Sequence, residues 1–355
     1  MKGKSCRKRI AVFFLFLLFL LLPAGCLQDI VPRLLDRTDS EREVEEIVPP
    51  SSGEDGSKLL EDVLPEGIFS YKVFFMEENG KYLLPVTIAA PWTEGIGRAA
   101  LGKLIAGPTP AQEMRFGLVP LLPPSTEVLG LSIRDGLARV DLSSSFLDYD
   151  TGLEREAINS VVFTLLQFPT VEEVEILVEG IVPEVYPGGT PGGSFSAEQR
   201  GVNIEVAGEI EDFGDTRPVI LYFCHVMGDN RVFYIPITRI VTGGKNIAGT
   251  VIEELLAGPR PGDILFSEIP PGTTLREITV ADDLVTVDFS RDILNFRGGI
   301  SGEEHLLRQI VLTLAEIPGV KRVQILVEGE AIIFPYGVSL EGPVETSSLL
   351  VNLLV

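Results

Sequence analysis

FPTVEEVEILVEG at residues 168–180 returns later in the chain as IPGVKRVQILVEG at residues 317–329. The two segments start 149 residues apart (317 − 168 = 149). A second pair, KLIAGPTP at 103–110 and ELLAGPRP at 254–261, starts 151 residues apart (254 − 103 = 151). Two matches in the same order and at nearly the same spacing indicate an internal duplication.

Three further pairs keep this order. They are LPVT at 84–87 with IPIT at 235–238, PPSTEVLGLSI at 123–133 with PPGTTLREITV at 270–280, and VDLS at 140–143 with VDFS at 287–290. Chance does not produce five collinear matches, so the chain carries one domain twice. The small changes in spacing fall at 111–122 and 294–301, where loops tolerate insertions.

The first half of each copy predicts a hairpin and a helix. Apolar runs at 69–76 and 81–89 flank an Asn-Gly turn, which is typical of a β-hairpin. Apolar residues at helical spacing predict a helix over 95–106. Gly107 and the proline after it predict the end of that helix.

The second half of each copy predicts two strands, a helix and a last strand. In the first copy these are expected at 128–134, 137–143, 153–167 and 174–180. The order β-β-α-β-β-α-β predicts the α+β class, with two tandem copies whose helices pack on one face of a mixed sheet. By fold-level analogy alone, this order is similar to ring-building-motif domains.

Five parts are expected along the chain. They are a lipoprotein signal peptide at 1–25, a flexible tether at 26–67, domain 1 at 68–189, a linker at 190–217 and domain 2 at 218–355. The tether mixes charge with Pro, Ser and Gly and has no sustained apolar period, as flexible segments do. An alternative for the linker is an ordered strand, VNIEVAG at 202–208, that fixes the two copies.

The amino terminus has the order of a secretory signal. Five basic residues precede an apolar run from Ile10 to Leu22, and Ala24 and Gly25 stand directly before Cys26. The small pair before Cys26 resembles a bacterial lipobox, which predicts lipidation of that thiol. Palmitate-type acyl chains would then anchor the protein at the outer face of the membrane. A spanning helix is the weaker alternative because thirteen residues cover only about 20 Å.

Charge argues against two kinds of partner. The formal net charge is −22, and removal of the five basic residues of the signal gives 24 − 51 = −27. Nucleic acid is excluded as a partner because it requires a basic face. An acidic surface also disfavours docking on anionic lipid, so membrane attachment depends on the lipid at Cys26.

Residues suited to chemistry are few. Cys224 lies in an apolar run and is expected to be a buried core residue rather than a catalytic thiol. The two histidines, His225 and His305, match no position of the other copy, so neither a catalytic triad nor a zinc site is expected. We therefore predict no enzyme, no catalytic residue, no metal and no cofactor.

Two carboxylate pairs recur between the copies. They are Asp141 with Asp288 and Glu179 with Glu328. Because each pair places one residue in each domain, no acid–base dyad is implied within a domain, and roles on a strand face or in a turn are expected. The glycine runs at 187–194 and 241–245 lack the phosphate-binding pattern and are interpreted as linker and turn.

The lipobox, the acidic spacer and two copies of the pattern with LxAGP, VDxS and ILVEG together resemble the GerM family of tandem GerMN domains. The resemblance covers about residues 68–355 and includes the closing run SLLVNLLV. It implies a sporulation and germination lipoprotein that helps place the channel complex between mother cell and forespore. It also implies other envelope or channel proteins as partners, with ring-like self-association as one arrangement. No catalytic residue comes with it.

Three functions are compatible with the sequence. The favoured one is a lipid-anchored envelope scaffold that presents sheet edges or helix faces to other proteins. The second is a solute-binding envelope lipoprotein, which requires a cleft between lobes. The third is a cell-wall-active enzyme such as a peptidoglycan hydrolase.

Overall fold

The computed structural model describes residues 62–197, 199–206, 216–242 and 246–354. The chain divides after Gly53 into two units, and the second unit, Glu54–Val355, is compact. The expected signal peptide and Cys26 lie outside the described residues. None of the described helices has the length and apolar character needed to cross a bilayer.

The first copy contains the expected elements and several additional short ones. They are β1 (Ile68–Glu77), β2 (Leu83–Pro91), α2 (Ile96–Ala106), α3 (Pro110–Phe116), β3 (Leu118–Val119), β4 (Val128–Arg134), β5 (Leu137–Leu142), η2 (Ser144–Asp148), η3 (Thr151–Leu153), α4 (Glu154–Leu166), β6 (Glu173–Val178) and β7 (Ser194–Ser196). Among these, α3 and β3 fall in the segment where the copies differ in length. A capping box at Thr109 and Gln112 begins α3.

The second copy repeats the pattern, and its described residues include no equivalent of α3. Its elements are β8 (Glu205–Val206), β9 (Thr216–Met227), β10 (Arg231–Thr242), α5 (Ile247–Ala257), β11 (Leu275–Ala281), β12 (Leu284–Phe289), η5 (Arg291–Asn295), α6 (Gly299–Ala315), β13 (Arg322–Val327), β14 (Val344–Glu345) and η6 (Thr346–Ser348). The helix and strand ranges expected in the first copy agree with the structure to within about two residues.

Each copy has a four-stranded mixed sheet, in the orders β4-β5-β6-β7 and β11-β12-β13-β14. The middle pairs, β5 with β6 and β12 with β13, are parallel, and the outer pairs are antiparallel. Tight turns at Asp135-Gly136 and Asp282-Asp283 join the first two strands, as predicted. The first turn residue has a φ of 50° or 55°, which aspartate tolerates better than most side chains.

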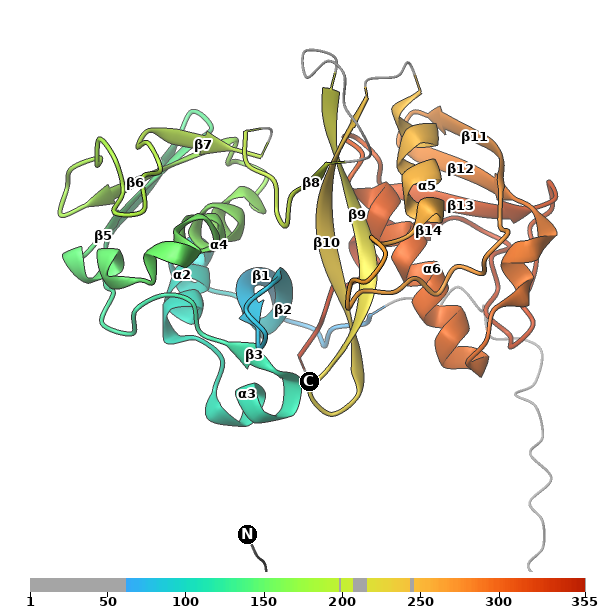
Figure 1. Ribbon diagram of the computed structural model, residues 1–355, viewed down its shortest axis with the longest axis horizontal. Helices are drawn as coiled ribbons and strands as arrows, with labels where there is room; N and C mark the ends of the chain where they lie inside the picture. Colours follow the sequence, from blue (N-terminus) through green and yellow to red (C-terminus); the bar gives the residue numbers. More distant parts are fainter. Residues whose placement is uncertain (1–61, 198, 207–215, 243–245, 355) are drawn as a thin grey trace, which may run out of the picture. The chain divides into compact units, whose positions relative to one another are not determined.

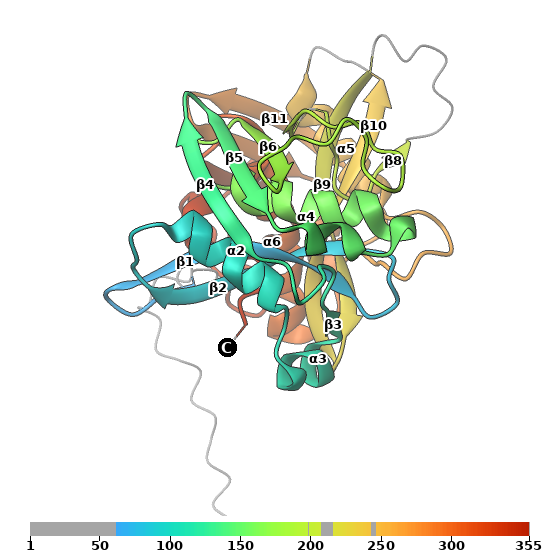
Figure 2. The same ribbon diagram turned by 90° about the vertical axis from the view of Figure 1, so that its left-hand side faces the viewer.

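The first hairpin of each copy forms a sheet of its own, in the orders β2-β1-β3 and β8-β10-β9. The helices lie between the two sheets: α2 and α4 contact β1 on one side and β4 or β6 on the other (Figures 1 and 2). In the second copy α5 and α6 separate β9 from β11 and β13 in the same way. The helices therefore pack on one face of the mixed sheet, as expected. The hairpin forms a third layer on the other side of the helices, whereas the sequence pattern had not distinguished it from the mixed sheet.

The core of both copies is continuous. Val73 and Phe75 of β1, Leu221 and Phe223 of β9 and the inner faces of the helices belong to one apolar cluster of buried side chains. Burial of this apolar surface is the main source of stability and joins the two copies energetically.

The segment expected to be a linker, 190–217, is partly built into both sheets. Within it, Phe195 of β7 pairs with Val174 of β6 in the first copy. Val206 of β8 pairs with Ile240 of β10 in the second copy. The alternative of an ordered strand in VNIEVAG is therefore confirmed for 205–206. The domain boundaries themselves remain a prediction.

Candidate interaction surface and the interdomain junction

The two copies meet where β2 packs beside β10. Both strands carry the matching segment LPVT or IPIT, so the copies meet through equivalent segments. Two Val-Asn dipeptides, Val202-Asn203 and Val351-Asn352, follow the last strand of each copy and bind to both hairpins. The junction is thus built from four segments that are equivalent in pairs.

Asn203 bridges the hairpins on one side. Its Oδ1 accepts a hydrogen bond from the Leu83 amide at 2.9 Å. Its Nδ2 donates to the carbonyl oxygens of Leu83 and Pro236, each at 2.7 Å. One side chain therefore holds β2 of the first copy and β10 of the second copy together.

Asn352 makes the equivalent bonds on the other side. Its Oδ1 accepts from the Tyr234 amide at 2.8 Å, and its Nδ2 donates to the carbonyl oxygens of Pro85 and Tyr234 at 2.8 and 2.9 Å. Leu83 and Tyr234 are equivalent positions, as are Pro85 and Pro236 (234 − 83 = 236 − 85 = 151). The two asparagines are thus related by an approximate two-fold axis, as in an isologous dimer interface.

Threonines complete the symmetry. The Thr238 amide donates to the Val202 carbonyl at 2.9 Å, and the equivalent Thr87 amide donates to the Val351 carbonyl at 3.2 Å. Asn203 and Asn352 both have a φ of 52°, a left-handed conformation that asparagine adopts more readily than most residues. Backbone conformation and side-chain bonding therefore select asparagine at both positions.

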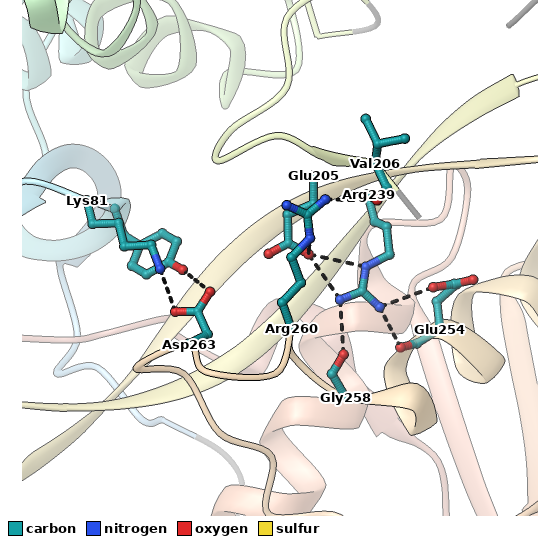
Figure 3. Close-up of polar contacts among 9 residues, drawn as sticks. Lys81, Glu205, Val206, Arg239, Glu254, Gly258, Arg260 and Asp263 are labelled. Atoms are coloured by element: carbon teal, nitrogen blue, oxygen red, sulfur yellow. Dashed lines mark hydrogen bonds and ion pairs between the residues drawn. The ribbon is translucent and has the colours of Figure 1, made fainter. Parts of the chain in front are cut away.

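A polar cluster closes the rim of the junction (Figure 3). Asp263 of the second copy accepts hydrogen bonds from the Lys81 Nζ at 2.8 Å and from the Tyr82 hydroxyl at 2.5 Å. Burial would raise the pKa of Asp263, but the hydrogen bonds from Lys81 and Tyr82 outweigh it and hold the pKa below its usual range. The carboxylate is thus stabilised in its charged form by the other copy.

Arg239 is the centre of the neighbouring group in Figure 3 and is buried. Its guanidinium donates to Glu205 of β8 at 3.1 Å, to the Glu254 carboxylate at 3.1 Å and to the Gly258 carbonyl at 3.0 Å. These contacts tie β8, β10, α5 and the turn after α5 to one another. A buried charge of this kind is stable only while its partners remain in place.

The chain that precedes β1 is bound to the second copy. Asp62 accepts hydrogen bonds from Arg308 of α6 at 2.8 and 2.9 Å, and from the Leu350 amide at 2.7 Å. Its own amide donates to the Ser348 carbonyl. The described end of the expected tether is therefore attached to α6 and to the closing segment of the second copy.

The cysteine and the two histidines that the sequence offered as candidates for chemistry lie in buried or partly buried surroundings. Cys224 is fully buried, as predicted, and burial raises the pKa of its thiol far above the usual range, which disfavours the thiolate. Burial lowers the pKa of His225 and of His305, and the His305 Nδ1 lies 2.7 Å from the Tyr234 hydroxyl. Within the described ranges, no group of three or more His, Cys, Asp or Glu side chains could hold a metal ion.

The recurring carboxylates serve turns, as predicted. The Asp141 Oδ1 accepts from the Gly180 amide at 2.8 Å, and the Asp288 Oδ1 accepts from the Gly329 amide at 2.8 Å. Glu179 and Glu328 have φ values of 51° and 54° in the same turns. The ILVEG motif therefore corresponds to the end of a strand and the turn that follows it.

Another equivalent pair, Glu154 and Glu303, was missed by the sequence reasoning. Glu154 is buried and accepts hydrogen bonds from the Tyr149 hydroxyl and from the amides of Gly188 and Thr190. Glu303 is also buried and accepts from the amides of Tyr336 and Val338. The sequence contained a signal for this pair, because the two acids recur 149 residues apart, within the first two turns of α4 and α6 (303 − 154 = 149).

A cavity of about 400 Å³ lies between the copies. Its lining includes Lys72 and Gln167 of the first copy and Tyr222 and Glu316 of the second. The Tyr222 hydroxyl donates to Glu316 at 2.9 Å, and Gln167 bonds to the backbone of Lys72. The side chains of Gln167, Tyr222 and Glu316 are thus already bonded to protein groups.

Comparison with known proteins agrees with this architecture. The profile of the Germane family, described as "Sporulation and spore germination", matches residues 72–183 and 220–333. The chain belongs to the Germane family. The spore germination protein GerM of Bacillus subtilis (strain 168) is 30% identical over 285 residues, which cover 78% of this chain and 76% of GerM.

A solved structure shows the same fold. The tandem GerMN domains of the sporulation protein GerM from Bacillus subtilis superpose with a TM-score of 0.69 and 28% sequence identity. The match covers 79% of this chain and 99% of that structure. The expected resemblance to the GerM family and the expected pair of repeated α+β domains are therefore confirmed.

Proposed function

We propose that this Germane-family protein is a lipid-anchored scaffold of the cell envelope that acts in sporulation, and through it in germination, by holding other envelope proteins. Its site of action would be the channel complex between mother cell and forespore. Family membership and the likeness to a spore germination protein support the biological setting. Cys26 is the proposed lipidation site and gives attachment at the extracytoplasmic face.

The interdomain junction is the observation that carries the scaffold proposal. Asn203 and Asn352 each bind both hairpins, and Asp62 binds the second copy to the chain that precedes the first. A protein that holds partners in a fixed arrangement benefits from such cross-links, because less conformational entropy is lost when the partners bind. Self-association into a ring is one arrangement of this scaffold.

Deletion and lipidation tests address the proposal directly. Cells without the gene are expected to form spores with a reduced yield or with slow germination. Cys26→Ala is expected to release the protein from the membrane fraction and to reproduce that defect, whereas Cys224→Ala should remain in the membrane fraction. A normal spore yield together with normal germination in the deletion strain would refute the proposed role.

The cavity between the copies favours one alternative, a solute-binding lipoprotein. Its volume lies in the range of small-molecule sites, and both copies contribute to its lining. A screen of envelope solutes by calorimetry against the full-length protein, with Glu316→Gln as the control variant, tests this function. Tight binding that Glu316→Gln abolishes would favour it over the scaffold.

A further inference from the structure

The cavity of about 400 Å³ between the copies borders on a smaller, apolar pocket. The pocket measures about 170 Å³ and shares four lining residues with the cavity, which are Lys72, Gln167, Tyr222 and Glu316. The rest of the pocket is lined by apolar residues, among them Phe74, Phe163 and Ile220. Small-molecule sites combine such a lining with a few well-placed polar groups. A ligand in contact with the four shared residues would therefore reach both the polar cavity and the apolar pocket.

The internal repeat identifies two equivalent pairs in this lining. Lys72 and Ile220 are equivalent, because each pairs with the matching threonine of its hairpin. Gln167 and Glu316 are equivalent as well (316 − 167 = 149). Each pair has one charged and one uncharged member. The first copy thus contributes a positive charge and the second copy a negative charge, which departs from the two-fold relation of the junction.

Lys72 brings a cation into this site. Its side chain lies on the same face of β1 as that of Phe74, because residues two apart on a strand point the same way, and both residues line the apolar pocket. The Lys72 backbone is bonded to the Gln167 side chain. Among the residues that the structure describes, no carboxylate lies within ion-pair distance of the Lys72 ammonium. The ammonium can therefore form a charge-assisted hydrogen bond with a carboxylate of a ligand.

Glu316 brings an anion from the second copy. Its Oε1 accepts a hydrogen bond from the hydroxyl of the buried Tyr222 at 2.9 Å, and within the described ranges its Oε2 accepts none. Tyr71 is 9% exposed and lines the same cavity, and its hydroxyl makes no hydrogen bond to the described part of the chain. The second copy therefore presents a positioned carboxylate oxygen to a ligand that carries an N–H donor.

We propose that this cavity binds a small zwitterion, an α-amino acid or dipeptide with an apolar side chain. The carboxylate of the ligand contacts Lys72, its ammonium contacts Glu316 and its side chain enters the apolar pocket. This inference goes beyond the scaffold function and gives a ligand class to the cavity, which the solute-binding alternative leaves open. Because the ligand contacts both copies of the folded protein, its binding stabilises the junction by mass action.

A titration of full-length protein in detergent, followed by ligand-detected NMR, tests the ligand class. L-leucine and L-phenylalanine are the probes, and at least one of them is expected to bind with a Kd of about 0.1 mM. Three compounds each lack one of the features: glycine has no apolar side chain, 3-phenylpropionate has no ammonium and 2-phenylethylamine has no carboxylate. Each should bind about tenfold more weakly or worse. Absence of binding by both probes up to about 10 mM would overturn the proposal, and so would equal binding by a probe and glycine.

Two substitutions assign the charges to residues. Lys72→Met keeps the stem of the side chain and removes the ammonium, so L-phenylalanine should then bind within about twofold of 2-phenylethylamine. Glu316→Gln keeps an acceptor for the Tyr222 hydroxyl and removes the charge, so L-phenylalanine should then bind within about twofold of 3-phenylpropionate. A change of structure would not produce this crossed pattern. The same loss for both analogues in either variant would contradict the assigned contacts.

Lys321→Met and Glu253→Gln are the matched controls, because both residues are exposed and lie outside the lining of the cavity and of the pocket. They should leave every affinity within about twofold of the wild-type value. Circular dichroism and urea unfolding verify that all four variants fold. The titration requires no sporulating cells, so a failure of the scaffold function leaves its result readable. A sporulation defect in the deletion strain without binding of either probe would sink this inference alone.

Discussion

At the scale of single residues, the junction depends on asparagines that combine a conformation with a bonding pattern. Asn203 and Asn352 each satisfy backbone groups from two hairpins in a left-handed conformation. Other small polar residues make only some of these hydrogen bonds. Aspartate has no N–H group to donate, and serine has a single hydroxyl in place of the separate donor and acceptor of the amide. Their repetition at equivalent places indicates that the junction depends on both.

Asn352→Ala tests this dependence. It leaves buried groups of Pro85 and Tyr234 without partners and places alanine at positive φ, so the free energy of unfolding is expected to fall by about 2–4 kcal/mol. Asn230→Ala is the matched control, because Asn230 is exposed in a turn at a φ of 66°. It should cost about 1 kcal/mol. Urea unfolding measures both, and equal losses would refute a special role for Asn352.

The buried carboxylate of Glu154 gives a pH dependence. Burial would raise the pKa of Glu154, but hydrogen bonds from Thr190, Gly188 and Tyr149 outweigh it and lower the pKa below its usual range. The charged carboxylate therefore stabilises the fold above the unfolded pKa, and this contribution is lost as the pH falls through the lowered folded pKa.

Glu154→Gln is accordingly expected to destabilise the protein at pH 7 and to do so progressively less as the pH falls below about 4.5. Urea unfolding from pH 7 to pH 3 provides the measurement. Glu173→Gln, on an exposed part of β6, serves as the control and should change little at any pH. A loss that is constant across this range would contradict the role assigned to Glu154.

At the scale of elements, β8 is held by the Arg239 cluster. The strand is two residues long, so its own ladder cannot fix it. The ion pair of Arg239 with Glu205 supplies the additional contact, and both side chains are buried. The hairpins, helices and tight turns were all predictable, because each depends on periodicity or on turn residues close in sequence. The sequence left open whether the linker contains an ordered strand, because a strand as short as β8 shows no clear alternation of apolar and polar residues.

Arg239→Ala is expected to release β8. It leaves the buried Glu205 with only the longer contact to the half-exposed Arg260, which is expected to cost about 3 kcal/mol and to make the chain at 204–206 more sensitive to protease. Arg260→Ala, whose side chain is 51% exposed in its contact with the same Glu205, should cost less than about 1 kcal/mol. Limited proteolysis with mass spectrometry of the fragments reports the difference. Unchanged cleavage in Arg239→Ala would show that the cluster does not hold β8.

At the scale of the whole described molecule, the copies share one core and an approximately symmetric junction. Their association is therefore expected to depend on the interface rather than on the covalent connection. An insertion of about ten Gly and Ser residues after Gly208 should lower the free energy of unfolding by about 1 kcal/mol or less. Trp92 fluorescence and circular dichroism should still report one coincident transition. Two separate transitions would show that the copies are independent.

The sequence by itself determined the duplication, the order of elements, the turns of each copy and the membership in the GerM-like family, because these depend on local patterns that recur. The tertiary structure decided that the hairpin forms a separate layer, that the two Val-Asn dipeptides join the copies and that Glu154 and Glu303 hold distant loops. Periodicity reports which face of a strand or helix is buried, but it does not report against which element. That choice is made by packing between residues far apart in the chain.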